Sequence, residues 1–187
     1  MKKNVFLTLI SAAFLFTSCN QETKEKDAVE NTTENDLTNK LIVKVEGVFP
    51  KNDQFQLFYS NDDKFEEDNS VSEVVYGQSV LQTLVFELPK DKKPQNLRLD
   101  LGANAAQTSI TIKDITIEYN GDKLENEEGK FRDLFGDTYF TVYDPVSFEY
   151  KLQPNDQNVF DPMLMGTDKL KRSLNKLYNN SKQGEAK

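Results

Sequence analysis

The side chains that most often perform catalysis are scarce in this chain. It contains no histidine, and Cys19 is its single cysteine. Mechanisms that pair a serine or cysteine nucleophile with histidine are therefore excluded, as are zinc and copper sites built from imidazole or several thiolates. No G-x-G-x-x-G or Walker phosphate loop occurs. The 31 carboxylates are too many for one pair to be singled out for glycoside hydrolysis. The sequence predicts a protein that is not an enzyme.

Carboxylates gather in residues 61–69, which read Asn-Asp-Asp-Lys-Phe-Glu-Glu-Asp-Asn. Hard oxygen ligands suit calcium, which takes about six to eight of them. The candidate calcium ligands are Asp62, Asp63, Glu66 and Asp68. The stretch lacks the glycine and the spacing of an EF-hand loop, so a solvated polar loop without a cofactor is the alternative interpretation.

Flat aromatic rings stack on the faces of sugars, and the chain has seven tyrosines but no tryptophan. Four tyrosines lie near the ends of predicted strands, where they can be presented to a ligand: Tyr59, Tyr76, Tyr139 and Tyr143. These are the candidate glycan-binding residues. The alternative is that they pack in the core or along its edges, because aromatic residues at strand spacing are usually structural.

The N-terminal residues predict a cleavable signal. Lys2 and Lys3 precede a mostly apolar segment, residues 5–16, which is followed by Thr17, Ser18 and Cys19. The apolar segment is shorter than the roughly 20 residues that span a bilayer. The sequence Phe-Thr-Ser-Cys resembles the lipobox of bacterial lipoproteins, in a form similar to that of the Bacteroidota. The resemblance implies cleavage after residue 18, lipid on Cys19 and membrane anchoring through several acyl chains. The alternative is a secreted protein with an ordinary signal and a free thiol.

Residues after Cys19 bear on the location and partners of the protein. Asn20 differs from the aspartate that retains lipoproteins in the inner membrane, and the acidic residues Glu22, Glu25 and Asp27 resemble a signal for surface export. The resemblance implies the outer membrane, at the cell surface or the periplasmic face. Without Lys2 and Lys3, 21 basic and 31 acidic residues remain, a net charge of −10. Such a chain is repelled by nucleic acids and anionic head groups, so any membrane association must come from the lipid.

Hydrophobic patterning divides the chain into a signal (1–18), a lipidated cysteine with a flexible polar tether (19–39), a β domain (40–160) and a C-terminal segment (161–187). In the β domain, short alternating runs follow each other without a long helix. This spacing predicts an all-β, antiparallel β-sandwich of jelly-roll or Greek-key topology. Residues 97–101 and 110–119 predict a hairpin, with a β-bulge where the alternation slips at Lys113 and Asp114. Asn120-Gly121 predicts a tight turn.

Two further segments carry specific predictions. Val146, Phe148, Tyr150 and Leu152 alternate and are expected to line one face of a strand. Thr167 is expected to cap a short amphipathic helix from residue 168 to about 179, followed by a disordered tail beyond residue 180. The basic face of this helix is either plain solvated surface on a docked helix or a surface for a partner or membrane.

The run Leu-Arg-Leu-Asp-Leu-Gly (97–102), followed by Ile-Thr-Ile-Lys-Asp-Ile-Thr-Ile (110–117), resembles the late strands of carbohydrate-binding-module-like jelly rolls in Bacteroidota surface proteins. The resemblance implies a β-sandwich that binds glycan. The expected function is therefore a lipid-anchored binding module for a glycan or another extracellular ligand. The alternative is a structural or accessory lipoprotein that docks onto an envelope protein complex through its sheet face or its C-terminal helix.

Overall fold

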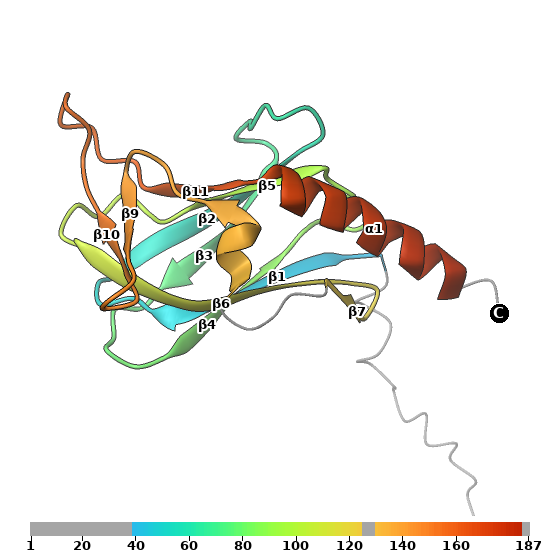
Figure 1. Cartoon of the computed structure of the whole chain (residues 1–187), viewed down its shortest axis with the longest axis horizontal. Coiled ribbons are helices and arrows are strands. Elements are labelled where there is room, and N and C mark those ends of the chain that lie inside the picture. The colour runs from blue at the N-terminus through green and yellow to red at the C-terminus, as the bar shows by residue number, and fades with distance from the viewer. Residues whose placement is uncertain (1–38, 125–129, 185–187) are drawn as a thin grey trace, which may run out of the picture. The chain divides into compact units, whose positions relative to one another are not determined.

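The computed structural model describes residues 39–124 and 130–184 (Figure 1). The predicted signal, Cys19 and the predicted tether up to residue 38 lie outside these residues. The chain divides into two units, residues 1–32 and 33–187, and the elements described below all belong to the second.

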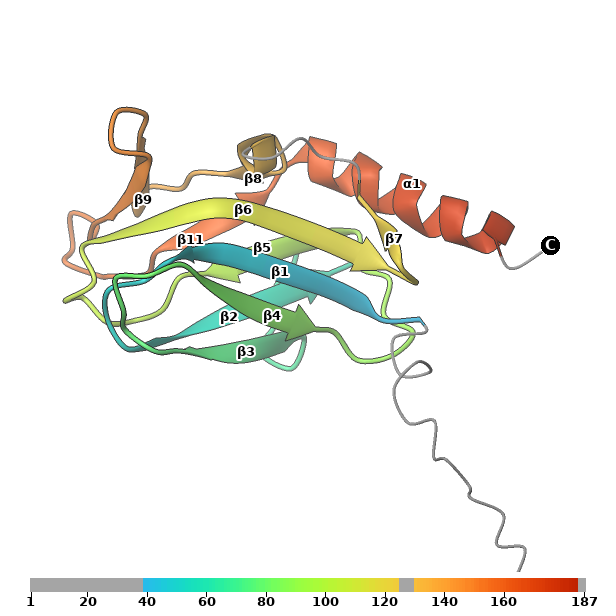
Figure 2. The same ribbon diagram turned by 90° about the horizontal axis from the view of Figure 1, so that it is seen from below.

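The second unit is a sandwich of two antiparallel sheets (Figure 2). The first sheet contains, in spatial order, β4 (Gln82–Glu87), β1 (Leu41–Val48), β6 (Ser109–Tyr119), β10 (Glu149–Leu152) and β9 (Thr141–Asp144), with β7 (Asp122–Lys123) beside β6. The second contains β3 (Ser70–Val75), β2 (Asp53–Ser60), β5 (Asn96–Asp100), β11 (Met163–Gly166) and β8 (Phe135–Gly136). A short 3₁₀ helix, η1 (Lys130–Asp133), precedes β8, and α1 (Asp168–Gly184) ends the described chain. The predicted all-β sandwich with a C-terminal helix is confirmed.

Five of the connections between consecutive strands that pass from one sheet to the other share a location: β1–β2, β3–β4, β5–β6, β8–β9 and β10–β11. The registers place all five connections at one end of the sandwich, which we call the crossover end (Figure 2). Asn39, where the described chain begins, lies at the opposite end with the 61–69 and 88–95 loops; we call this the entry end. Strands β1 to β6, β10 and β11 have the pairings of a jelly roll in permuted chain order.

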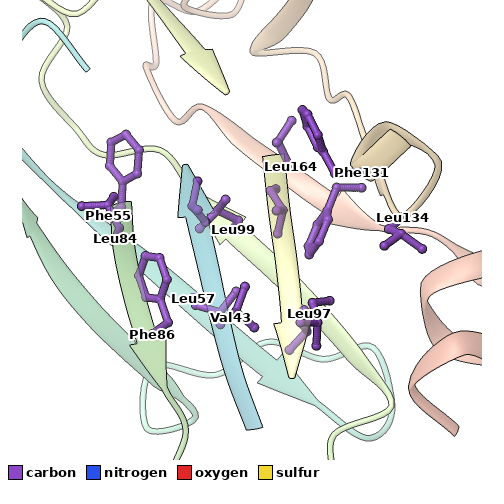
Figure 3. Packing of buried hydrophobic residues seen from close by; sticks show 14 of the residues in the cluster. Val43, Phe55, Leu57, Leu84, Phe86, Leu97, Leu99, Phe131, Leu134 and Leu164 are labelled. Carbon is purple, nitrogen blue, oxygen red and sulfur yellow. The ribbon is translucent and has the colours of Figure 1, made fainter. Parts of the chain in front are cut away.

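Alternating apolar residues from both sheets fill the space between them (Figure 3). In β5, for example, Leu97 and Leu99 are fully buried, whereas Arg98 between them lies on the outer face of the sheet. This period of two is the pattern that the sequence predicts, because successive strand side chains point to opposite faces. Leu164 of β11 joins the same core. Residues 163–166, assigned from sequence to the C-terminal segment, are therefore a strand of the second sheet.

The predicted hairpin of residues 97–119 is wrong in one respect: β5 and β6 are strands, but they lie in opposite sheets and do not pair. Their connection is a crossover held by the Asp53 carboxylate, which accepts hydrogen bonds from the backbone N–H groups of Ala103 (3.1 Å) and Asn104 (3.2 Å). Alternation of apolar and polar residues shows that a strand buries one of its faces. A strand does so in either sheet of this sandwich, so alternation does not show which sheet a strand joins. Hydrophobic pattern alone could not tell a hairpin from a crossover.

Two local predictions are confirmed in β6. Glu46 of β1 pairs with Asp114 and Gly47 pairs with Ile112, so Lys113 is the extra residue of a β-bulge. The bulge explains the phase slip in the sequence. Asn120 and Gly121 both have positive φ, 52° and 80°, and they form the turn from β6 to β7. Asparagine and glycine tolerate this conformation better than other residues do.

Helix α1 begins after Thr167, whose Oγ1 accepts a hydrogen bond from the Leu170 N–H (3.3 Å), as predicted for an N-cap. Leu170, Leu174 and Leu177 are buried against the sandwich, so the helix is docked by its apolar face. The helix continues to Gly184, so the prediction of disorder beyond residue 180 is wrong for residues 181–184. Burial of Ser181, with its hydroxyl donating to Asp122 (2.8 Å), extends the docked part beyond the predicted end.

The predicted strand face of Val146, Phe148, Tyr150 and Leu152 is also wrong. Tyr150 and Leu152 lie in β10 and are buried, but Val146 (87% exposed) and Phe148 (63% exposed) lie in the turn between β9 and β10. Phe148 has a positive φ of 59°, so the alternation that would carry a strand through this residue is broken by the backbone.

Candidate functional site

The four candidate tyrosines do not form one site. Tyr59 is at the entry end of β2 and is 6% exposed, and burial raises the pKa of its hydroxyl. Tyr143 is half-buried in β9, where its ring centroid lies 3.6 Å from the guanidinium carbon of Arg132. Tyr76 and Tyr139 lie at the crossover end and are 70% and 55% exposed. Only these two of the four present most of a ring to solvent.

Tyr139 forms one wall of an open hollow of about 330 Å³, which we call the Tyr139 hollow. Its lining residues are Tyr139, Phe140, Asn155, Asp156 and Gln157. The Tyr139 hydroxyl donates a hydrogen bond to the Asp156 carboxylate, and this bond raises the pKa of Tyr139 because it favours the protonated hydroxyl. The ring of Phe140 packs edge-on against Tyr139, with ring centroids 5.9 Å apart. The Tyr139 side chain is therefore held in place although it is exposed.

The opposite wall belongs to the connection between β10 and β11. The Asn155 side-chain oxygen accepts hydrogen bonds from the backbone N–H groups of Gln157 (3.0 Å) and Val159 (2.9 Å), which folds the loop into a tight turn. The Gln153 side-chain amide donates to the Tyr139 carbonyl (3.0 Å) and joins the two walls. An aromatic face beside a carboxylate and amides can bind a pyranose, because the aromatic ring can stack on the sugar and the polar groups can bond its hydroxyls.

Two of the four candidate calcium ligands of the 61–69 loop, Asp62 and Asp63, are engaged with protein donors. Asp62 accepts hydrogen bonds from the Ser60 hydroxyl (3.1 Å) and the Lys64 N–H (3.2 Å). Asp63 accepts from Asn96 (2.7 Å) and from Lys171 of α1 (2.6 Å), and the bond to Lys171, followed by that to Asn96, lowers the pKa of Asp63. In the described part of the chain, no group of three or more acidic, histidine or cysteine side chains is arranged to hold a metal ion. Calcium binding by Asp62, Asp63, Glu66 and Asp68 stays a prediction.

The structure does bring one candidate tyrosine together with this loop. Tyr59, Asp62 and Glu66 line a hollow of about 300 Å³ at the entry end. Lys92, across the hollow on the turn between β4 and β5, places its ammonium group 5.9 Å from the Tyr59 ring centroid. The 59–69 segment and the turn that carries Lys92 are brought together by the pairing of β2 with β5. The sequence did not predict this proximity.

Sequence reasoning also missed an apolar edge of the sandwich. Strand β4 is one edge strand of the first sheet, β3 is one edge strand of the second, and the two lie next to each other. Large apolar side chains along this edge are exposed to between 36% and 70%: Val74, Tyr76, Val80, Leu81 and Val85. Val80 and Leu81 lie in the connection that precedes β4, which begins at Gln82.

Comparisons with known proteins give no further identification: no family model, curated protein or solved structure matches this chain. Among the described residues, no helix is both long enough and apolar enough to span a membrane.

Proposed function

We propose that this protein is a lipid-anchored binding module of the outer membrane that holds a glycan in the Tyr139 hollow. The observation that carries the proposal is the fixed, exposed Tyr139 ring beside Asp156 and the amides of Asn155 and Gln157. The hollow lies at the crossover end, whereas the predicted anchor precedes Asn39 at the entry end. Loops at one end of a β-sandwich are a common place for ligand binding.

The proposal is tested with a glycan array followed by calorimetry on the full chain. Tyr139→Ala is expected to weaken glycan binding about tenfold, since an aromatic contact contributes roughly 1 kcal/mol beyond its buried area. Tyr76→Ala is the matched control, because it removes another largely exposed tyrosine that lies outside the hollow, and it should leave the affinity unchanged. Absence of binding to every glycan, or equal affinity of the Tyr139→Ala protein, contradicts the proposed site.

A second candidate function is docking onto an envelope protein, and the exposed apolar edge of β3 and β4 favours it. Edge strands carry backbone groups available for pairing with another chain, and the Val74 and Val85 side chains add apolar contact area. This function is distinguished from the first by the variant Val74→Lys/Val85→Lys. It should abolish co-purification of a membrane partner and leave glycan binding intact, whereas Tyr139→Ala should do the reverse.

A further inference from the structure

A third concave surface lies between α1 and the turn that joins β4 to β5. Its volume is about 460 Å³, and we call it the cationic hollow. Its lining residues are Lys93, Pro94, Gln95, Lys171, Arg172, Asn175, Tyr178 and Asn179. Three of these residues are basic and none is acidic, although the whole chain carries a net charge of −8. Positive charge is therefore concentrated at this surface.

The turn between β4 and β5 forms one wall of the cationic hollow and is hydrogen-bonded to both α1 and β2. The buried Tyr178 hydroxyl donates to the Pro94 carbonyl (3.1 Å), and the Gln95 N–H donates to the Ser60 carbonyl (2.9 Å). The ammonium group of Lys93 lies 4.9 Å from the ring centroid of Tyr119, a cation–π contact. The Tyr119 ring packs edge-on against Tyr178, with centroids 5.1 Å apart. The Lys93 ammonium group is therefore positioned by the Tyr119 ring, which is itself packed against Tyr178.

The charges of the hollow are only partly compensated by the protein. Lys171 is bound to Asp63 (2.6 Å), and this hydrogen bond raises the pKa of Lys171. Within residues 39–124 and 130–184, the ion pairs between side chains include neither Lys93 nor Arg172. An anion that enters the hollow therefore meets two cations without first breaking an ion pair. The Arg172 guanidinium can bind a carboxylate, sulfate or phosphate through two parallel hydrogen bonds.

Three amide side chains accompany these cations: Gln95, Asn175 and Asn179. The Asn179 amide donates to the Asn175 side-chain oxygen (3.0 Å), which orients both groups on one side of α1. Amides donate and accept hydrogen bonds and so match the hydroxyls of a sugar. The concave shape suits an inserted ligand rather than a flat membrane surface, and the net negative charge disfavours nucleic acid.

We propose that the cationic hollow binds an anionic carbohydrate. Lys93 and Arg172 pair with its carboxylate, sulfate or phosphate groups, and Gln95 and Asn175 bind its hydroxyls. This site is at the opposite end of the sandwich from the Tyr139 hollow and shares no residue with it. The two sites can therefore be tested, and can fail, independently.

The test uses calorimetry on the mature full chain with Cys19→Ser, which keeps lipid out of the measurement. The probes are trigalacturonate and a heparin tetrasaccharide, with neutral maltotriose, inorganic phosphate and phosphatidylcholine–phosphatidylglycerol vesicles as comparisons. We expect one of the anionic oligosaccharides to bind more tightly than maltotriose and than phosphate, and about 0.5 M NaCl to weaken the binding. Lys93→Ala/Arg172→Ala should weaken it by about tenfold or more.

The matched control Lys51→Ala/Lys151→Ala removes the same charge from the crossover end of the protein and should leave the affinity unchanged. The charge-conserving variant Lys93→Arg/Arg172→Lys should retain binding within a few-fold and separates loss of charge from loss of folding. The proposal is overturned if neither anionic oligosaccharide binds, if the Lys93→Ala/Arg172→Ala and control variants lose affinity equally, or if only the vesicles bind. Binding of phosphate as tightly as the oligosaccharides also overturns it, since the amides would then have no role.

Discussion

Gly102 shows how a single residue fixes the path of the chain between the two sheets. Its φ is +89°, and a Cβ at this position would lie 2.2 Å from the carboxyl carbon of Asp53. Asp53 needs that space because its carboxylate accepts the hydrogen bonds from Ala103 and Asn104 that hold the crossover. A side chain at residue 102 would therefore both strain the backbone and displace the carboxylate.

We expect Gly102→Ala to lower the free energy of unfolding by about 2 kcal/mol or more. Gly121→Ala is the control, because Gly121 also has a positive φ (80°) but nothing lies within 4 Å of a Cβ there. It should cost about 1 kcal/mol for the backbone conformation alone. Urea denaturation of the two variants measures the difference, and an equal or smaller loss for Gly102→Ala would show that Asp53 does not need the space.

The Asp63–Lys171 pair joins the 61–69 loop to α1 and gives the stability a dependence on pH. The hydrogen bond from Lys171, with that from Asn96, lowers the pKa of Asp63 below its ordinary value of 3.8. An acid with a lowered folded-state pKa stabilises the fold above its unfolded-state pKa, and this stability is lost as the pH falls through the folded-state pKa. The contribution is therefore fully present at neutral pH and begins to decrease as the pH falls below about 4.

We expect Lys171→Met to lower the melting temperature at pH 7 and to have a smaller effect at about pH 3, where Asp63 of the unfolded state already binds a proton. Thermal unfolding followed by circular dichroism measures both shifts. Lys51→Met serves as the control, since Lys51 forms neither this ion pair nor a contact with α1 in the described structure. An effect of Lys171→Met that is the same at both pH values would assign it to packing instead.

At the scale of elements, α1 is a structural part of the sandwich that also forms one wall of the cationic hollow. Leu174 is fully buried at the middle of its apolar face. Residues on the other face, Arg172 and Asn175, line the hollow. The same 3.6-residue period thus produces a buried stripe and a polar surface, and the buried stripe fixes where the polar groups point.

We expect Leu174→Ala to lower the free energy of unfolding by about 2–5 kcal/mol, the usual cost of truncating a buried leucine. Lys176→Ala, on an exposed position of the same helix, should change it by no more than about 0.5 kcal/mol. Chemical denaturation gives both values. A near-neutral Leu174→Ala would contradict docking of the helix as a source of stability.

At the scale of the whole molecule, the crossover end and the entry end have different roles in our proposals. The Tyr139 hollow and its neighbouring loops lie at the crossover end, and the described chain begins at Asn39 at the other end. Membrane attachment in our proposal rests on the predicted acylation of Cys19, which precedes Asn39 in the chain.

Cys19→Ala is expected to move the protein from the membrane fraction to the soluble fraction and to abolish labelling with palmitate. Anchoring by several acyl chains is stable, whereas the acidic chain is repelled by anionic lipid, so no partial retention is expected. Tyr139→Ala should stay in the membrane fraction and serves as the control. Palmitate labelling of the Cys19→Ala protein would show that the lipid is attached elsewhere or that anchoring has another origin.

Features that depend on neighbouring residues could be predicted from the amino-acid sequence. Alternation predicted that β5 and β6 are strands, the phase slip predicted the bulge at Lys113, and Asn120-Gly121 predicted the turn. Each follows from the local geometry of the backbone and from the requirement that one face of a strand be apolar. Thr167 and the leucines after it predicted the start and the buried face of α1 in the same way.

Which distant segments meet became clear from the folded structure. It placed β5 and β6 in opposite sheets, brought Met163–Gly166 into the second sheet and put Tyr139 beside Asp156. Lys93 and Arg172 line the same cationic hollow, although Lys93 belongs to a turn and Arg172 to the C-terminal helix. Strand alternation has the same period whichever sheet a strand joins. The choice of partner is made by packing between residues distant in the chain, and the proposed sites arise from that choice.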